Sequence, residues 1–197
     1  MKVLGITGGI GCGKSLILKQ LKNDYGAYII ETDSLAHSLM KKGQIIYDAI
    51  IKEFGEEILA SDDEIDREKL GKIVFSDKDK LKKLNSISHP LVKQYILNDI
   101  KEKRTQNIKL YVIEAALLIQ DGYKTICDEI WYIWASEETR ISRLMANRGY
   151  SLEKCKQVIN NQENEDYYRK YTNYTINNEK SIEDSSKQLK VLLNKFL

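Results

Sequence analysis

The hydrophobic positions of the chain alternate between two periods. Short apolar runs rich in β-branched and aromatic residues predict five buried strands, at residues 2–7, 27–32, 109–118, 129–135 and 173–178. Apolar residues recur at helical spacing in between, and predict helices at residues 14–24, 34–40, 43–54, 67–75, 79–87, 90–103, 136–149, 151–162 and 181–196. Short apolar strands separated by helices are typical of an α/β fold with a parallel sheet covered on both faces.

The spacing of these elements also predicts the organisation of the chain. The helical stretch between the second and third strands is too long for a simple crossover, so we expect an inserted helical lobe at about residues 36–104. A smaller helical insertion, a lid, is expected at about residues 137–170. The core of a single domain spanning residues 1–197 would then comprise about residues 1–35, 105–136 and 171–197.

Charge and cysteine content narrow the function classes. The 31 Lys and Arg residues nearly balance 29 Asp and Glu residues, for a net charge of +2, which argues against a dedicated nucleic-acid binder. Cys12, Cys127 and Cys155 have no C-x-x-C spacing, so we expect neither a disulfide framework nor a zinc site, and we expect a cytoplasmic protein. No apolar stretch reaches about 18 residues, so no membrane span is predicted.

A glycine-rich segment joins the first predicted strand to the first predicted helix. Residues 8–15 read GGIGCGKS and fit the phosphate-binding pattern G-x-x-x-x-G-K-[ST] of P-loop NTPase-type folds. Glycines let backbone N–H groups approach phosphate oxygens, and the following helix adds the positive end of its dipole. We expect Lys14 at the β- and γ-phosphates and Ser15 on Mg²⁺. A turn that binds nothing is the alternative. The expected nucleotide contacts are Gly8, Gly9, Ile10, Gly11, Cys12, Gly13, Lys14, Ser15 and Leu16.

Asp33 follows the second predicted strand, where a parallel sheet would bring it near the phosphate-binding loop. A carboxylate there could take the proton of an acceptor hydroxyl during phosphoryl transfer. Asp33 also suits the N-cap of the next predicted helix, and the two roles are compatible. Guanine-specific GTPases usually carry N-K-x-D after a later strand, and this chain does not. Together these features favour a small-molecule kinase.

Several segments occur in the order and spacing of dephospho-CoA kinases: GITGGIGCGKS, IIETDSLAHSL, FGEEIL, IDREKLGKIVF, LNSISHPLV, EAALLI, RLMANRG and VINNQ. The resemblance covers about residues 2–178 and implies a five-stranded parallel core with a helical substrate-binding insertion and a lid. It also implies transfer of phosphate from ATP, with Mg²⁺, to the ribose 3′-hydroxyl of dephospho-coenzyme A, the last step of coenzyme A synthesis. The partners would be ATP and dephospho-CoA, and the enzyme a monomer or weak homo-oligomer.

The resemblance assigns roles to individual residues. It implies Asp33 as catalytic base, Lys14 and Arg143 as groups that stabilise the transferring phosphoryl group, Arg148 and Asn177 on the nucleotide side, and Arg67, His89 and Glu114 on the substrate side. Considered without the resemblance, Arg67 suits an ion pair with Glu64 or Glu68, and His89 suits a structural position ahead of Pro90, which would begin a helix.

The chain departs from the family pattern in places. His37 stands where arginine is common, and Ala116 and Gln120 replace a usual proline and glutamate, which puts the contacts of that glutamate in doubt. Cys12 stands where serine is frequent, and its position beside Lys14 and a helix N-terminus predicts a stabilised thiolate. Two rivals stay open: a kinase for nucleoside monophosphate or shikimate-like acceptors, and a nucleotide-binding regulator without turnover.

Overall fold

The computed structural model describes residues 1–197 and divides into two compact units. The core unit comprises residues 1–30 and 104–197, and the inserted unit comprises residues 31–103. No helix combines the length and the hydropathy needed to cross a membrane.

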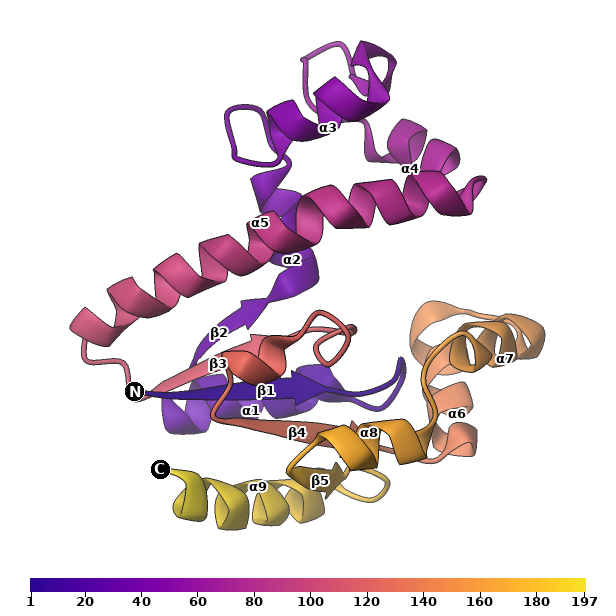
Figure 1. Ribbon diagram of the computed structural model, residues 1–197. Helices are drawn as coiled ribbons and strands as arrows, with labels where there is room; N and C mark the ends of the chain where they lie inside the picture. The colour runs from indigo at the N-terminus through magenta and orange to yellow at the C-terminus, as the bar shows by residue number, and fades with distance from the viewer. The chain divides into compact units, whose positions relative to one another are not determined.

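The core unit is built on a five-stranded sheet of order β2-β3-β1-β4-β5 (Figure 1). β1 pairs in parallel with β3 and with β4, and β4 pairs in parallel with β5. The predicted parallel sheet flanked by helices is therefore confirmed. Its strands are β1 (Lys2–Thr7), β2 (Tyr28–Glu31), β3 (Leu110–Glu114), β4 (Glu129–Trp134) and β5 (Tyr174–Asn177). Its helices are α1 (Lys14–Tyr25), α6 (Glu137–Arg148), α7 (Leu152–Asn160), α8 (Glu165–Tyr171) and α9 (Ile182–Phe196), with a short 3₁₀ turn η2 (Tyr123–Thr125).

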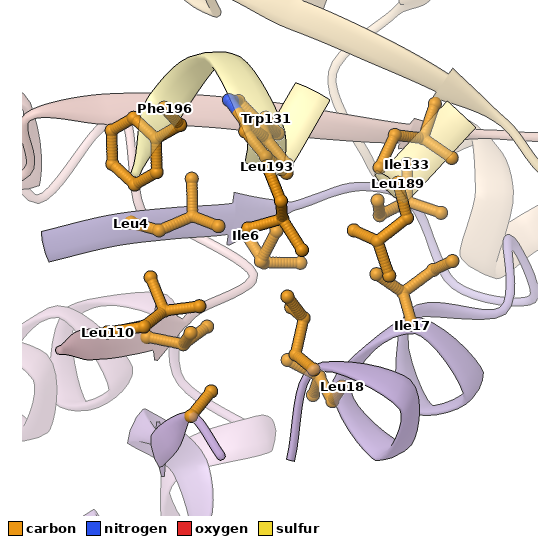
Figure 2. Close-up of a cluster of buried hydrophobic side chains, with 14 of the residues drawn as sticks. Leu4, Ile6, Ile17, Leu18, Leu110, Trp131, Ile133, Leu189, Leu193 and Phe196 are labelled. Carbon is orange, nitrogen blue, oxygen red and sulfur yellow. The ribbon is translucent and has the colours of Figure 1, made fainter. Parts of the chain in front are cut away.

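One face of the sheet packs on α1 and α9 to form the main hydrophobic core (Figure 2). Alternate residues of β1, Leu4 and Ile6, are fully buried there beside Trp131 of β4, as the period of two along a strand requires. Each fully buried side chain of this kind contributes about 1.5–3 kcal/mol. This packing fixes the carboxyl end of β1, from which the glycine-rich loop starts. The labelled residues in Figure 2 are Leu4, Ile6, Ile17, Leu18, Leu110, Trp131, Ile133, Leu189, Leu193 and Phe196.

Aromatic packing secures a segment that the hydrophobic pattern did not single out as an element. Residues 165–171 form the helix α8, whose Tyr168 is buried and stacks on Tyr132 of β4 with ring centroids 4.7 Å apart. Aromatic pairs of this kind add stability beyond their buried area. Tyr168 therefore anchors α8 to the sheet.

The inserted unit is helical. It contains α2 (Thr32–Leu39), α3 (Tyr47–Phe54), η1 (Glu56–Ile58), α4 (Arg67–Phe75) and α5 (Lys78–Thr105). The side chain of Asp66 caps α4 by accepting hydrogen bonds from the backbone N–H groups of Glu68 (2.9 Å) and Lys69 (3.1 Å). This cap begins the helix at Arg67.

The prediction that Pro90 begins a helix is wrong, because Pro90 lies inside α5, a single helix of 28 residues. Proline removes one hydrogen bond from a helix interior. However, Ser88, Val92, Ile96 and Ile100 are buried at intervals of four residues on both sides of this position. The continuous buried stripe stabilises one helix where the sequence pattern indicated two.

Candidate active site

The glycine-rich segment has the strand–turn–helix arrangement that the motif predicted. β1 ends at Thr7, residues 8–13 turn, and α1 begins at Lys14 after Gly13, whose φ of 88° lies in the left-handed region. Within the loop, the N–H of Cys12 donates to the carbonyl of Gly9 at 3.3 Å. The loop thus curls at the N-terminus of a helix, which is a favourable site for a phosphate group.

Side chains outside the loop leave little room beside two of these glycines. A Cβ atom on Gly9 would lie 2.4 Å from Nη2 of Arg140, and one on Gly13 would lie 2.2 Å from Nδ2 of Asn178. Real Cβ atoms do not approach other atoms so closely, and the left-handed conformation of Gly13 adds strain for any other residue. These glycines therefore admit packing on the outer side of the loop as well as a ligand on the inner side.

The side chain of Lys14 folds back over the loop. Its Nζ donates to the carbonyl of Gly8 at 2.8 Å and to that of Gly9 at 3.5 Å, and lies 3.7 Å from Oε1 of Glu114 at the end of β3. The side chain of Ser15, in the first turn of α1, is exposed. The structure thus brings the expected residues Lys14, Ser15 and Glu114 to the carboxyl ends of adjacent strands.

The expectation of a stabilised Cys12 thiolate is contradicted. Cys12 is 1% exposed, and burial raises the pKa of its thiol above the ordinary value, although the charge of Lys14 opposes this effect. Loss of hydration penalises the charged form more than the nearby cations favour it. Cys127 has its pKa raised to about 12 by burial as well.

Helix α6 carries three arginines, Arg140, Arg143 and Arg148, in different surroundings. Its N-terminus is held by Glu179, which accepts hydrogen bonds from the N–H of Ser136 at 2.7 Å and from Oγ1 of Thr139 at 2.5 Å. These bonds, that from Thr139 first, lower the pKa of Glu179. Arg140 donates from Nε to the carbonyl of Ile10 at 2.8 Å. The first turn of α6 is therefore fixed from outside the helix.

Arg143 and Arg148 differ in position. Arg143 donates to the carbonyl of Asn178 at 2.8 Å and to that of Cys12 at 3.4 Å, so it lies against the loop. Arg148, the last residue of α6, is exposed and forms no hydrogen bond or ion pair with the loop. The structure therefore brings Arg143, and not Arg148, to the P-loop.

Sequence reasoning selected Asn177 and missed its neighbour. Asn177 is exposed, and its Oδ1 accepts from the N–H of Glu179 at 2.9 Å. Asn178 is 2% exposed, donates from Nδ2 to the carbonyl of Cys12 at 2.8 Å, and accepts from Oγ of Ser185 at 2.7 Å. The pair Asn-Asn after a strand was the only signal, and it did not indicate which amide faces inward.

The remaining expected residues belong to the inserted unit. Asp33 is exposed in the first turn of α2, whose N-cap is Glu31, so Asp33 is not the capping residue. His89 is half-buried in the middle of α5.

Arg67 donates from Nη2 to Nε2 of His37 at 2.9 Å, and it forms no ion pair with Glu64 or Glu68; Glu68 instead pairs with Lys72. Because a guanidinium group has no acceptor, Nε2 of His37 carries no proton in this contact. Burial and the charge of Arg67 lower the pKa of His37, and the charge of Asp33 opposes them.

Comparison with known proteins places this arrangement in a family. Residues 2–184 match the family model described as dephospho-CoA kinase. The dephospho-CoA kinase of Carboxydothermus hydrogenoformans is 37% identical over 100% of this chain and 95% of its own length. That of Lactobacillus johnsonii is 38% identical over 98% of this chain and 97% of its own length.

Solved structures agree with the sequence comparisons. Dephospho-CoA kinase from Campylobacter jejuni superposes with a TM-score of 0.73 at 26% identity, covering 100% of this chain and 98% of its own. A protein from Thermus thermophilus reaches 0.82 at 28% identity, with the same coverage. Shikimate kinase from Acinetobacter baumannii, at 15% identity and a TM-score of 0.56 over 100% of this chain and 96% of its own, shares the fold. The chain is an enzyme that belongs to the dephospho-CoA kinase family.

Proposed function

We propose that this enzyme transfers the γ-phosphoryl group of ATP to the ribose 3′-hydroxyl of dephospho-CoA, giving coenzyme A and ADP. The bond between the 3′-oxygen and the γ-phosphorus forms as the bond from that phosphorus to the β,γ-bridging oxygen breaks, and ADP leaves. The observation that carries the proposal is the P-loop at residues 8–15, with Lys14 beginning a helix at the end of β1, in a chain of this family.

The nucleotide side of the reaction falls to the core unit. Backbone N–H groups within residues 8–16, other than that of Ile10, which donates to Gln162, cradle the phosphates, and Lys14 and Arg143 stabilise negative charge on the transferring group. Arg143 already lies against the loop, which supports this role. We propose that Arg148 and Asn177, whose side chains are exposed, contact the nucleotide away from the P-loop.

The exposed hydroxyl of Ser15 suits Mg²⁺, which prefers oxygen ligands and usually keeps few protein contacts. We infer that Ser15 would hold Mg²⁺, which would supply positive charge to offset the negative charge of the transferring phosphoryl group. Oε1 of Glu114 lies 3.7 Å from Nζ of Lys14, near enough to orient the ammonium group.

The acceptor side falls to the inserted unit. Asp33 takes the proton of the 3′-hydroxyl as general base. Its carboxylate is exposed and does not cap α2, so it is available for that task. Arg67 and His89 bind the acceptor, and Glu114 of the core unit contributes from the end of β3. We propose residues 36–104 as the substrate-binding insertion and residues 137–170 as the lid. We also propose a monomer or weak homo-oligomer in the cytoplasm, where the three free thiols would persist.

The test is ADP release with Mg-ATP across a panel of dephospho-CoA, AMP, shikimate and pantothenate, with products weighed by mass spectrometry. We expect turnover with dephospho-CoA alone and a product heavier by one phosphate. Turnover with another acceptor, or none with any, would contradict the proposed substrate.

The role of Asp33 is tested by Asp33→Asn. We expect kcat to fall by about 10²–10⁴-fold, the usual contribution of a general base, with an unchanged unfolding midpoint. Asp48 is an exposed aspartate in the first turn of α3 in the same unit, so Asp48→Asn is the matched control and should keep wild-type kcat. Wild-type turnover in Asp33→Asn would rule out this carboxylate as the base.

A further inference from the structure

Both polar groups of Ile10, at the tip of the P-loop, are held by side chains from the α6–α8 region. Oε1 of Gln162 accepts from the N–H of Ile10 at 2.9 Å, and Nε of Arg140 donates to the carbonyl of Ile10 at 2.8 Å. Nη2 of Arg140 also donates to Oε1 of Gln162 at 2.7 Å. The three residues therefore form a closed ring of hydrogen bonds, which we call the tip clamp.

The tip clamp fixes the orientation of two consecutive peptide planes. All peptide bonds of the chain are trans, so the C=O and N–H of one peptide point in opposite directions. The N–H of Ile10 faces Gln162, and the carbonyl of Gly9 in the same peptide accepts on the other side from the N–H of Cys12 (3.3 Å) and from Nζ of Lys14 (3.5 Å). Gln162 therefore decides which group of this peptide faces the loop interior.

The next peptide follows the same logic. Because the carbonyl of Ile10 faces Arg140, the N–H of Gly11 points away from α6, and no acceptor in the chain takes it. Backbone N–H groups turned inward are the donors that a P-loop offers to phosphate. The tip clamp therefore turns a donor toward the place where a phosphate would bind.

Packing around the ring keeps it in place. A Cβ atom on Gly9 would lie 2.4 Å from Arg140 and 3.0 Å from Gln162, so only glycine leaves room for the ring. The side chain of Ile10 packs into a small hydrophobic cluster with Leu144 of α6 and Ile159 of α7. The tip is thus bound to this region through its backbone and its side chain.

We propose that Gln162 is a positioning residue for the nucleotide: it holds the Gly9–Ile10 peptide in the orientation that gives the P-loop its phosphate-binding shape. This inference rests on the proposed function only for the identity of the nucleotide. A ligand that binds one loop conformation loses affinity in proportion to the fraction of protein in that conformation. Loss of the hydrogen-bond acceptor at position 162 therefore weakens nucleotide binding. It leaves the binding of dephospho-CoA unchanged.

The experiment compares Gln162→Met, which keeps length and loses the acceptor, with Gln162→Glu, which keeps an acceptor for both donors. ADP affinity is measured by calorimetry with Mg²⁺, and KM is measured for ATP and for dephospho-CoA. We expect Gln162→Met to weaken ADP binding and raise the KM for ATP by about tenfold, the effect of losing one to two hydrogen bonds. We expect an unchanged KM for dephospho-CoA and values within about twofold of wild type for Gln162→Glu.

Gln157 is an exposed glutamine on α7, so Gln157→Met and Gln157→Glu are the matched controls and should bind ADP as wild type does. Arg140→Met should weaken ADP binding similarly, and the double variant with Gln162→Met should lose less than the product of the two single effects. Wild-type ADP affinity in Gln162→Met, or a Gln162→Glu variant as weak as Gln162→Met, would overturn the inference. ADP binding is measured without dephospho-CoA. A change in ADP affinity is therefore distinguishable from a failure of turnover with dephospho-CoA.

Discussion

Replacing Asn178 by alanine tests whether a buried amide behind the P-loop holds its shape. The variant loses the bond from Nδ2 to the carbonyl of Cys12 and the bond that Oδ1 accepts from Ser185. Each contributes about 1 kcal/mol, and a buried group left without its partner adds about 1–3 kcal/mol. Cys12 and Ser185 keep weaker bonds, at 3.4 Å to Arg143 and 3.3 Å to Ser181, so we take the low end of that penalty. The expected loss is about 3 kcal/mol.

The assay is urea and thermal unfolding followed by circular dichroism. For a chain of this size, about 3 kcal/mol lowers the midpoint by about 9 °C. Asn161→Ala, at an exposed asparagine that follows α7, should stay within about 0.5 kcal/mol of wild type. A loss below about 1 kcal/mol in Asn178→Ala would refute the reasoning.

Asn178→Asp tests the hydrogen-bond donor of Asn178 separately from the size of its side chain. It keeps the acceptor for Ser185 but sets a carboxylate oxygen against the carbonyl of Cys12, where the amide donates. We expect Asn178→Asp to be at least as destabilised as Asn178→Ala at neutral pH. A stable Asn178→Asp variant would mean that the donor to Cys12 is dispensable.

Three further predictions concern His37 of the inserted unit and Cys12 and Gly13 of the P-loop. The pKa of His37 is lowered in the folded state, so as pH falls the unfolded chain binds this proton before the folded protein does, and the folded state loses stability below about pH 6.5. The unfolding midpoint of His37→Gln should therefore drop less between pH 7.5 and 5.5 than that of the wild type. An equal drop would exclude His37 as the cause. Cys12 should react with iodoacetamide far more slowly in the folded protein than in urea, as judged by peptide mass spectrometry, because it is buried and its pKa is raised; equal rates would contradict this. Gly13→Ala should abolish measurable ADP binding by calorimetry, because its Cβ would meet Asn178 at 2.2 Å in a left-handed backbone, and wild-type affinity would refute that clash.

All five strands could be predicted from the sequence, because short apolar runs between segments of helical periodicity indicate buried strands. The prediction overran the third strand: the apolar run continues to Leu118, but β3 ends at Glu114. Leu118 is buried all the same, in the turn that follows the strand. Hydrophobic pattern reports burial, and it cannot tell where the backbone leaves the sheet.

The candidate site divides in the same way. The P-loop could be predicted because its residues are contiguous and its chemistry is carried by the backbone. Asn178 and Gln162 could not, because they reach the loop from 166 and 152 residues away. In the sequence, Asn178 and Gln162 resemble ordinary loop residues. Only the fold shows that their amide groups pair with backbone groups that need hydrogen-bond partners.

The outer packing of the P-loop has a consequence for synthesis on the ribosome. Residues 8–13 emerge before the groups that pack against them, which are a backbone carbonyl of β4, Arg140 of α6 and Asn178 beyond β5. β1 itself waits for β3 and β4, its partners on either side. Folding that depends on such distant contacts is slow. A nascent chain that ends before residue 178 therefore carries the complete nucleotide motif without its binding shape.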